Sequence, residues 1–517
     1  MSTAATPANS RPQHGDDSAG TTPTATTPPV NPRRWLALIF IAIAQLMVVV
    51  DVTIVNIALP SAQDSLGVSD GAKQWVITAY TLAFGSLLLL GGRIADYTGR
   101  KRTFLIGIVG FAGASALGGA AQSFGMLLAS RALQGAFGAL LAPSALSLLA
   151  VNFTEPKERA KAFGVFGAIA GGGSALGMVL GGVLTEYLDW RACFYVNVPI
   201  AVIAGVGAYM VLTETRMPGR TRFDIPGVLL VTSGLFAVVY ALSEAESKGW
   251  GSALVLGLLA AGAVLLAVFV YVESRAERPL LPLPIALNRT RGSAYLAIGL
   301  SVIGMFAMFL ILTYYFQGVR HYSPLKAGLA FLPMSVAVVV AGGGISARLL
   351  PKVPPRALMV PGLLIAACGM FLLSQMTVDS SYAAVVLPAE LLLGGGMGLV
   401  MAPAMNYATH GVAAKDTGVA SAMANTAQQV GGSIGIALLN TIATRATGTY
   451  MEDHRAELMK DPSVKFDGVV HGFSVATGWA TLILVAAAAL VGLLMNTPRP
   501  KIAEVGADAP APAVHVG

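Results

Sequence analysis

The stretch Gly92-Arg93-Ile94-Ala95-Asp96-Tyr97-Thr98-Gly99-Arg100-Lys101-Arg102 lies between two long apolar runs of the chain. It is too short to hold a folded domain, so it predicts a tight loop between two membrane-length helices. Lys and Arg next to a membrane span resist translocation, and the basic cluster therefore marks the cytoplasmic face. The loop thus orients the chain in a bilayer and predicts the two helices that it joins.

The composition excludes a soluble globular protein. Of the 517 residues, 55% are hydrophobic and 11% are charged, with a mean hydropathy of +0.70, whereas soluble domains average about 25% charged residues. The net charge of +7 does not indicate nucleic acid, because the bases gather in alternate loops rather than on one face. The chain has no G-x-x-x-x-G-K-[ST] motif and no Cys/His cluster, so we expect no ATP, no metal and no cofactor.

Fourteen apolar segments are long enough to cross a bilayer, which takes about 20 helical residues. Their runs are continuous rather than alternating, so we expect helices and not a barrel. The predicted spans are residues 35–59, 75–92, 103–121, 126–150, 160–183, 194–212, 226–243, 252–272, 293–316, 326–349, 357–375, 383–405, 418–443 and 473–495. With the N-terminus inside, 23 of the 33 bases fall in cytoplasmic segments, which predicts an even number of spans and two cytoplasmic ends.

The chain also repeats itself after 260 residues. Residues 134–143 in the fourth span match residues 394–403 in the twelfth, with Gly138 and Pro143 in register with Gly398 and Pro403. Such repeats are common in secondary transporters, whose substrate site lies between the two halves. We predict six-helix bundles at 35–212 and 293–495, an inserted helix pair with cytoplasmic linkers at 213–292, and disordered cytoplasmic tails at 1–34 and 496–517.

The opening loop, Gly-x-x-x-Asp-x-x-Gly-Arg-Lys-Arg, resembles the loop signature of the major facilitator superfamily of transporters. With the strings around Asp51 and at 190–199, the chain resembles the fourteen-helix drug:proton antiporters of that superfamily. The resemblance implies an all-α integral membrane fold of two six-helix bundles plus two inserted helices. It also implies that Asp96 holds the halves together by contacting a neighbouring helix terminus. The cytoplasmic gate motif comprises Gly92, Asp96, Gly99, Arg100, Lys101 and Arg102, whose bases balance the acid, and Tyr97 stands where an arginine is common.

Asp51 in the first span is a candidate proton-binding group, because an intramembrane carboxylate is costly. At 1.5 Å per residue, Arg131 in the fourth span differs from it by about 5 Å in depth, so the two side chains are expected to pair. Protonation of Asp51 would weaken the pair and bias two conformations. A fixed salt bridge is the alternative. Glu390 is a second proton site, an anchor for cationic drugs or a glutamate at the lipid interface.

The fifth span carries a row of small residues that resembles an exporter signature and is expected to let the bundles rock: Gly164, Gly173, Gly177, Gly181 and Gly182. Met178 replaces a proline of that signature, which leaves the direction of transport open. Six polar residues are candidates for the substrate cavity: Gln45, Asn56, Tyr314, Tyr315, Gln317 and Gln428.

The favoured function is proton-coupled efflux of multiple drugs or antibiotics by a monomer in the cytoplasmic membrane, with amphiphilic small molecules, protons and the lipid bilayer as partners. A same-fold transporter of one metabolite, natural product or siderophore is the alternative. The histidines are scattered through tails and loops, which argues against an integral membrane enzyme.

Overall fold

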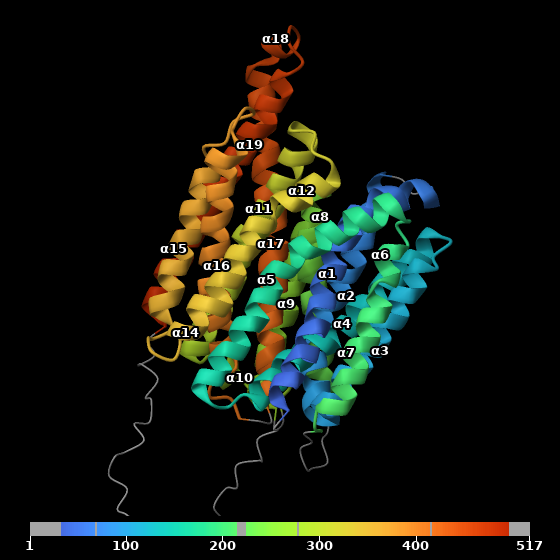
Figure 1. Cartoon of the computed structure of the whole chain (residues 1–517), viewed down its shortest axis with the longest axis vertical. Helices are drawn as coiled ribbons and strands as arrows, with labels where there is room; N and C mark the ends of the chain where they lie inside the picture. Colours follow the sequence, from blue (N-terminus) through green and yellow to red (C-terminus); the bar gives the residue numbers. More distant parts are fainter. Residues whose placement is uncertain (1–32, 68–69, 215–223, 277–278, 414–415, 496–517) are drawn as a thin grey trace, which may run out of the picture.

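The computed structural model describes residues 33–67, 70–214, 224–276, 279–413 and 416–495, which form a bundle of long helices (Figure 1). The predicted tails lie outside the described residues, apart from Arg33 and Arg34. Arg34 already belongs to the first helix, so that helix begins one residue earlier than predicted.

The N-terminal half follows the predicted order of spans, with the sixth span divided between two helices. It contains α1 (Arg34–Leu66), α2 (Asp70–Thr98), α3 (Arg100–Gly119), α4 (Phe124–Asn152), α5 (Pro156–Tyr187), α6 (Ala192–Tyr195) and α7 (Asn197–Val211). Local signals set several boundaries. Gly67, at φ 62°, ends α1, and the Ser123 side chain caps α4 by accepting from the Met126 N–H. Gly99, at φ 104°, makes the turn between α2 and α3.

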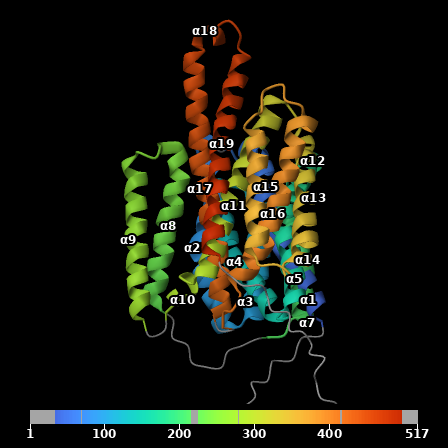
Figure 2. The same cartoon turned by 90° about the vertical axis from the view of Figure 1, so that its left-hand side faces the viewer.

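The inserted pair consists of α8 (Ile225–Lys248) and α9 (Ala253–Arg275), followed by the short α10 (Leu283–Ala286). Figure 2 shows both long helices standing at the side of the bundle. The inner helix of the pair, α8, packs on α2 and on α17 (Thr417–Asp453), while α9 packs mainly on α8. Thr78 and Ser243 hydroxyls lie 2.9 Å apart, and Trp250 Nε1 donates to Thr441 Oγ1 at 2.9 Å. The pair therefore contacts both halves.

The C-terminal half contains the longest described helix, α17, with 37 residues. Its elements are α11 (Arg289–Tyr314), η1 (Tyr315–Val319), α12 (Pro324–Ala330), α13 (Leu332–Val339), η2 (Val340–Ser346), α14 (Ala347–Leu349), α15 (Arg356–Leu373), η3 (Tyr382–Val386), α16 (Leu387–Ala408), α17, α18 (Arg455–Leu458) and α19 (Val464–Leu494). The π-helical turn η2 interrupts the predicted span 326–349, whereas η1 lies at the end of the predicted span 293–316 and η3 at the start of the predicted span 383–405. Beyond the end of the other helices, α17 and α19 extend as a hairpin closed by α18 (Figures 1 and 2).

Within the described residues, twelve helical segments are long and apolar enough to cross a membrane. The predicted fifth and thirteenth spans are not among them, although α5 and α17 are 32 and 37 residues long. Both helices lie inside the bundle: α5 packs on α1 and α16, and α17 packs on α2 and α11. The total of fourteen spans stays a prediction.

The internal repeat is visible as repeated packing. A Cβ on Gly138 of α4 would lie 3.0 Å from the Phe84 ring of α2, and one on Gly398 of α16 would lie 2.6 Å from the Val338 carbonyl of α13. Each helix also carries an internal proline, Pro143 or Pro403. Both halves thus bring their fourth span against their second through small residues.

Candidate functional site

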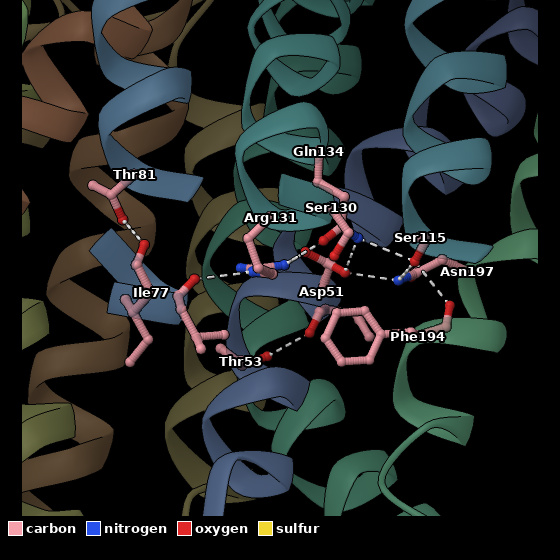
Figure 3. A network of polar contacts seen from close by, with 12 residues as sticks. Asp51, Thr53, Ile77, Thr81, Ser115, Ser130, Arg131, Gln134, Phe194 and Asn197 are labelled. Carbon is pink, nitrogen blue, oxygen red and sulfur yellow. Dashed lines mark hydrogen bonds and ion pairs between the residues drawn. The ribbon is translucent and has the colours of Figure 1, made fainter. Parts of the chain in front are cut away.

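Asp51 of α1 is fully buried at the centre of a polar cluster in the N-terminal half (Figure 3). Arg131 Nη1 donates to its Oδ2 at 2.7 Å. Its Oδ1 accepts from Gln134 Nε2 at 2.8 Å and from Asn197 Nδ2 at 2.7 Å. The contact expected from the depths of Asp51 and Arg131 is therefore present, and it is an ion pair enclosed by protein. Its role in proton transfer stays a prediction.

Arg131 links this cluster to α2. Its Nε donates to the Val76 carbonyl at 3.2 Å, and its guanidinium carbon lies 4.5 Å from the centre of the Tyr80 ring. The side chain is 2% exposed, so its charge has no bulk water around it. Removing one partner from such a pair costs about 3–5 kcal/mol, because the other charge stays buried and unpaired.

Sequence reasoning missed three members of the cluster: Gln134, Asn197 and Ser115. Ser115 Oγ of α3 accepts from Gln134 Nε2 at 3.0 Å and from Asn197 Nδ2 at 2.9 Å, and it donates to the Phe194 carbonyl at 2.8 Å. One available signal was the spacing of Gln134, three residues after Arg131 on the same helix face. The cluster joins α1, α3, α4 and α7, and all of them belong to the N-terminal half.

Asp96 connects the two halves at the C-terminal end of α2. Its Oδ1 accepts from the Gly418 N–H at 3.0 Å and its Oδ2 from the Val419 N–H at 3.3 Å, at the N-terminus of α17. A carboxylate at a helix N-terminus is favourable because free N–H groups and the helix dipole both face it. This is the contact that the family resemblance implied. Its role as a gate stays a prediction.

The basic residues of the loop do not act together as expected. Only Arg100 pairs with Asp96, at 3.0 Å. Lys101 Nζ instead donates to the Tyr209 carbonyl at 2.7 Å, and Arg102 lies 3.6 Å from Glu214. The expectation that all three balance Asp96 is wrong, because successive helical residues point in different directions.

Arg93, for which we predicted no role of its own, holds three segments together at this end. Its Nη1 lies 3.1 Å from Asp416 Oδ1, its Nη2 donates to the Pro279 carbonyl at 2.7 Å, and its Nε donates to the Leu280 carbonyl. The guanidinium also lies 5.7 Å from the Tyr97 ring. Arg93, one helical turn before Tyr97, therefore places its positive charge beside the position at which the family commonly has an arginine.

Further contacts join the two halves at the same end of the bundle as Asp96. Arg159 of α5 donates to Asn406 Oδ1 at 2.8 Å and to Thr409 Oγ1 at 2.7 Å in the C-terminal half. A Cβ on Gly92 would lie 2.6 Å from the Gly418 carbonyl oxygen, and one on Gly418 would lie 2.4 Å from that of Gly92. The halves touch here backbone to backbone, so this end is closed.

The glycines of α5 do not form one sliding face. A Cβ on Gly177 would lie 1.9 Å from Thr53 Oγ1, and one on Gly173 or Gly181 would also meet α1. Gly164 instead faces the other half, with its Cβ 2.8 Å from the Gly342 carbonyl oxygen by the same measure. Gly182 is buried. The expected rocking surface is therefore split, because Gly164 lies nine residues before Gly173 and so points to the opposite side of the helix, while glycines 4 residues apart stay on one side. Met178 lies in an unbroken α5.

Glu390 of α16 is fully buried in the C-terminal half, so the expectation of a lipid-interface glutamate is wrong. Of the predicted cavity residues, Tyr315 is buried, its hydroxyl 3.3 Å from the Thr377 carbonyl, and Tyr314 is 59% exposed. Gln45 is buried, while Gln317 and Gln428 are half-buried. The Asn56 side chain lies outside the described part of the chain. These residues come from three regions, and their shared cavity stays a prediction.

Comparison with known proteins gives a consistent result. The family model described as Major Facilitator Superfamily matches residues 41–436. The puromycin resistance protein of Streptomyces alboniger is 51% identical over 485 residues, covering 93% of this chain and 95% of that protein. The cephamycin export protein of Amycolatopsis lactamdurans is 38% identical over 436 residues, covering 84% and 89%. The crystal structure of the human organic anion transporter MFSD10 has the same fold, with a TM-score of 0.62, 15% identity, and coverage of 89% and 99%.

Proposed function

We propose that this chain, which belongs to the major facilitator superfamily, exports antibiotics from the cytoplasm in exchange for protons. The chain is a multi-pass membrane protein and an efflux transporter that moves small molecules, and its family consists of transporters rather than enzymes. The proposal adds the proton, the class of substrate and the orientation. We place the protein in the cytoplasmic membrane as a monomer with fourteen spans and both ends inside.

The observation that carries proton coupling is the buried pair of Asp51 and Arg131 at 2.7 Å. Among the described residues, the three side-chain groups that bond to the Asp51 carboxylate are N–H donors, so this arrangement fits the ionised acid. A proton arriving from outside would remove the negative charge and leave Arg131 buried without a counter-charge. That state is costly, so protonation favours a rearrangement that returns water or another acceptor to Arg131.

Helix α2 connects this pair to the inner gate. Near one end its Val76 carbonyl accepts from Arg131, and at the other end its Asp96 binds the N-terminus of α17. The 20 residues between Val76 and Asp96 span about 30 Å of helix. A shift of Arg131 therefore acts on α2, the helix that holds the halves together. Because α2 is rigid and is bound at both ends, its movement couples protonation of Asp51 to opening of the gate at Asp96.

The substrate class rests on the relatives. A resistance protein named for puromycin shares 51% of its residues with this chain, and a cephamycin exporter shares 38%. Puromycin is therefore the first compound to test. Export of a single natural product, rather than of many drugs, is the second candidate, because the more similar of these two relatives is named for one antibiotic.

The test uses a pump-deficient bacterial host and inverted membrane vesicles from it. Expression should raise the concentration of puromycin that the host survives, and vesicles should take up labelled puromycin when their interior is acidified. An uncoupler should abolish this uptake. Uptake that ignores the uncoupler would refute the proton motor, and a panel of unrelated drugs separates a multidrug pump from a dedicated exporter.

A further inference from the structure

Glu390 and Asp51 are both fully buried carboxylates, but their surroundings are opposite. Asp51 receives three N–H donors, one of them from a guanidinium. Within the described residues, Glu390 has no ion-pair partner, and its Oε1 has no hydrogen-bond partner. A buried carboxylate without a cation or strong donors is far more costly than the neutral acid.

Among the described residues, the side chain that reaches Glu390 is Tyr382 of η3, whose hydroxyl lies 3.5 Å from Oε2. The same hydroxyl lies 2.8 Å from the Ala330 carbonyl oxygen at the end of α12. A tyrosine has one hydroxyl proton, and the shorter contact to Ala330 takes it. Glu390 then gains a hydrogen bond only if it carries its own proton and donates it to the Tyr382 oxygen. The geometry therefore fits a protonated acid.

Other titratable groups near this turn of α16 are engaged elsewhere. The Tyr315 hydroxyl of η1 points to the carbonyls of residues 377, 378 and 380. Arg320 donates to the Val378 carbonyl, and Lys326 lies 4.0 Å from the centre of the Tyr322 ring. The main elements that pack on α16, which are α5, α11, α13, η2 and α15, bring no ion-pair partner to Glu390 among their described residues.

Aromatic rings enclose the Tyr382 side of the site. The Phe316 ring lies 6.1 Å from the Tyr382 ring, 5.5 Å from the Phe331 ring and 5.4 Å from the Tyr322 ring. Such a wall supplies no hydrogen bonds to a carboxylate and keeps the local dielectric low. By the 260-residue repeat, Glu390 corresponds to Ser130, the neighbour of Arg131. The N-terminal half thus pairs the acid Asp51 with the base Arg131, whereas in the described part of the C-terminal half the acid Glu390 has no basic partner.

We propose that Glu390, with Tyr382 as its hydrogen-bond acceptor, is a second proton-binding site of the transport cycle, protonated in the conformation in which Asp51 is ionised. The proton leaves the Glu390 carboxyl to water when the C-terminal half opens toward the cytoplasm, and water on the outer side restores it. This inference rests on the proposed proton-driven export. It implies that each cycle moves one proton at each acid.

The first test measures stoichiometry in liposomes containing the full-length protein, with the membrane potential clamped at zero. At steady state, the logarithm of the puromycin accumulation ratio rises linearly with the pH difference, with a slope equal to the number of protons exchanged. The slope should be about 2 for the native protein and about 1 for Glu390→Gln, because coupling of substrate to protons is thermodynamic. An unchanged slope in Glu390→Gln overturns the inference, while a slope near zero in the native protein overturns the proposed function instead.

The second test does not require transport. Infrared difference spectra between acidic and alkaline buffer detect the C=O stretch of a buried protonated carboxyl. The band should be present in the native protein and in Asp51→Asn, shift in Tyr382→Phe, and vanish in Glu390→Gln. Glu452→Gln, at an exposed acid near the end of α17, is the matched control and should keep the band and the slope. If the carboxyl band of the native protein is still present in Glu390→Gln, the second proton site is refuted, even if that variant fails to transport.

Discussion

The guanidinium of Arg131 and the carboxylate of Asp51 lie 2.7 Å apart with side chains 2% and 0% exposed, so each is the only counter-charge that the other has in this part of the described structure. Their partners Gln134 and Asn197 are neutral amides. The two opposite charges therefore make the cluster neutral as a whole. Replacing either residue leaves the other as an unpaired buried charge, which lowers the stability of the protein.

Asp51→Asn and Arg131→Gln are each expected to lower the free energy of unfolding by about 3–5 kcal/mol, because each leaves one buried charge. The double variant should lose clearly less than the sum, because it removes both charges together. Thermal unfolding in detergent measures this coupling. All three variants should lose export driven by a pH gradient, whereas Arg445→Gln, at an exposed position, should change neither property. Additive losses in the double variant would show that the two groups do not interact.

Gly92→Ala should weaken the closed inner end. Its new Cβ would lie 2.6 Å from the Gly418 carbonyl oxygen and 2.7 Å from the Ala422 Cβ, and forced overpacking costs about 1–3 kcal/mol. The cost falls on the closed conformation, so the population shifts toward the inner-open one. Gly113→Ala on α3 has no atom within 4 Å of its new Cβ and is the control.

The measurement is maleimide labelling of a cysteine introduced by Ser421→Cys, a buried position on α17. The protein is studied in inverted vesicles, in a background in which Cys193 and Cys368 have been replaced. Labelling should be faster in Gly92→Ala than in Gly113→Ala. Equal rates would mean that the glycine contact does not hold the gate.

Arg93→Ala should open the same end by a different route. The buried guanidinium donates to two carbonyls and to Asp416, and a hydrogen bond that involves a charged group contributes about 1.5–3 kcal/mol. Arg102→Ala is the control, because its side chain is 58% exposed and an exposed ion pair contributes about 0–1 kcal/mol. Labelling of Ser421→Cys should rise strongly in the first variant only. Similar labelling in both would remove Arg93 from the gate.

Gly177→Ala should disturb the seam between α1 and α5 two residues from Asp51. Its Cβ would lie 1.9 Å from Thr53 Oγ1 and 2.9 Å from the Val50 carbonyl oxygen, so a loss of about 1–3 kcal/mol in unfolding free energy is expected. Thr53→Ala in the same chain removes the nearer atom and should restore part of that loss. Gly257→Ala on α9, with open space around its Cβ, should be neutral. A neutral Gly177→Ala would contradict the packing described for this seam.

The order of the helices was predictable because membrane spans are encoded locally. Apolar length, the alternation of basic loops and the Gly/Pro repeat each involve residues close in the chain, and the bilayer supplies the rest of the constraint. The same reasoning placed Asp51 and Arg131 within about 5 Å of each other in depth, since a helix converts residue number into height. The predicted contact of Asp96 with a helix terminus came from the family resemblance rather than from the residues alone.

Other features depended on which faces meet. Gly173 and Gly177 face α1 while Gly164 faces the C-terminal half, and the sequence alone does not distinguish these partners. Asn197 and Ser115 reach Asp51 only because α3 and α7 stand beside α1. Arg93 meets Asp416 across 323 residues of chain.

The sequence by itself therefore determined the order of the apolar helices and the relative depth of residues within them, since these follow from hydropathy and helical rise. Only the tertiary structure decided which polar groups share a buried cluster and which acid is left without a base. In a low-dielectric interior, contacts of a few ångströms determine whether a charge is stable, and those contacts are made by helices far apart in the chain.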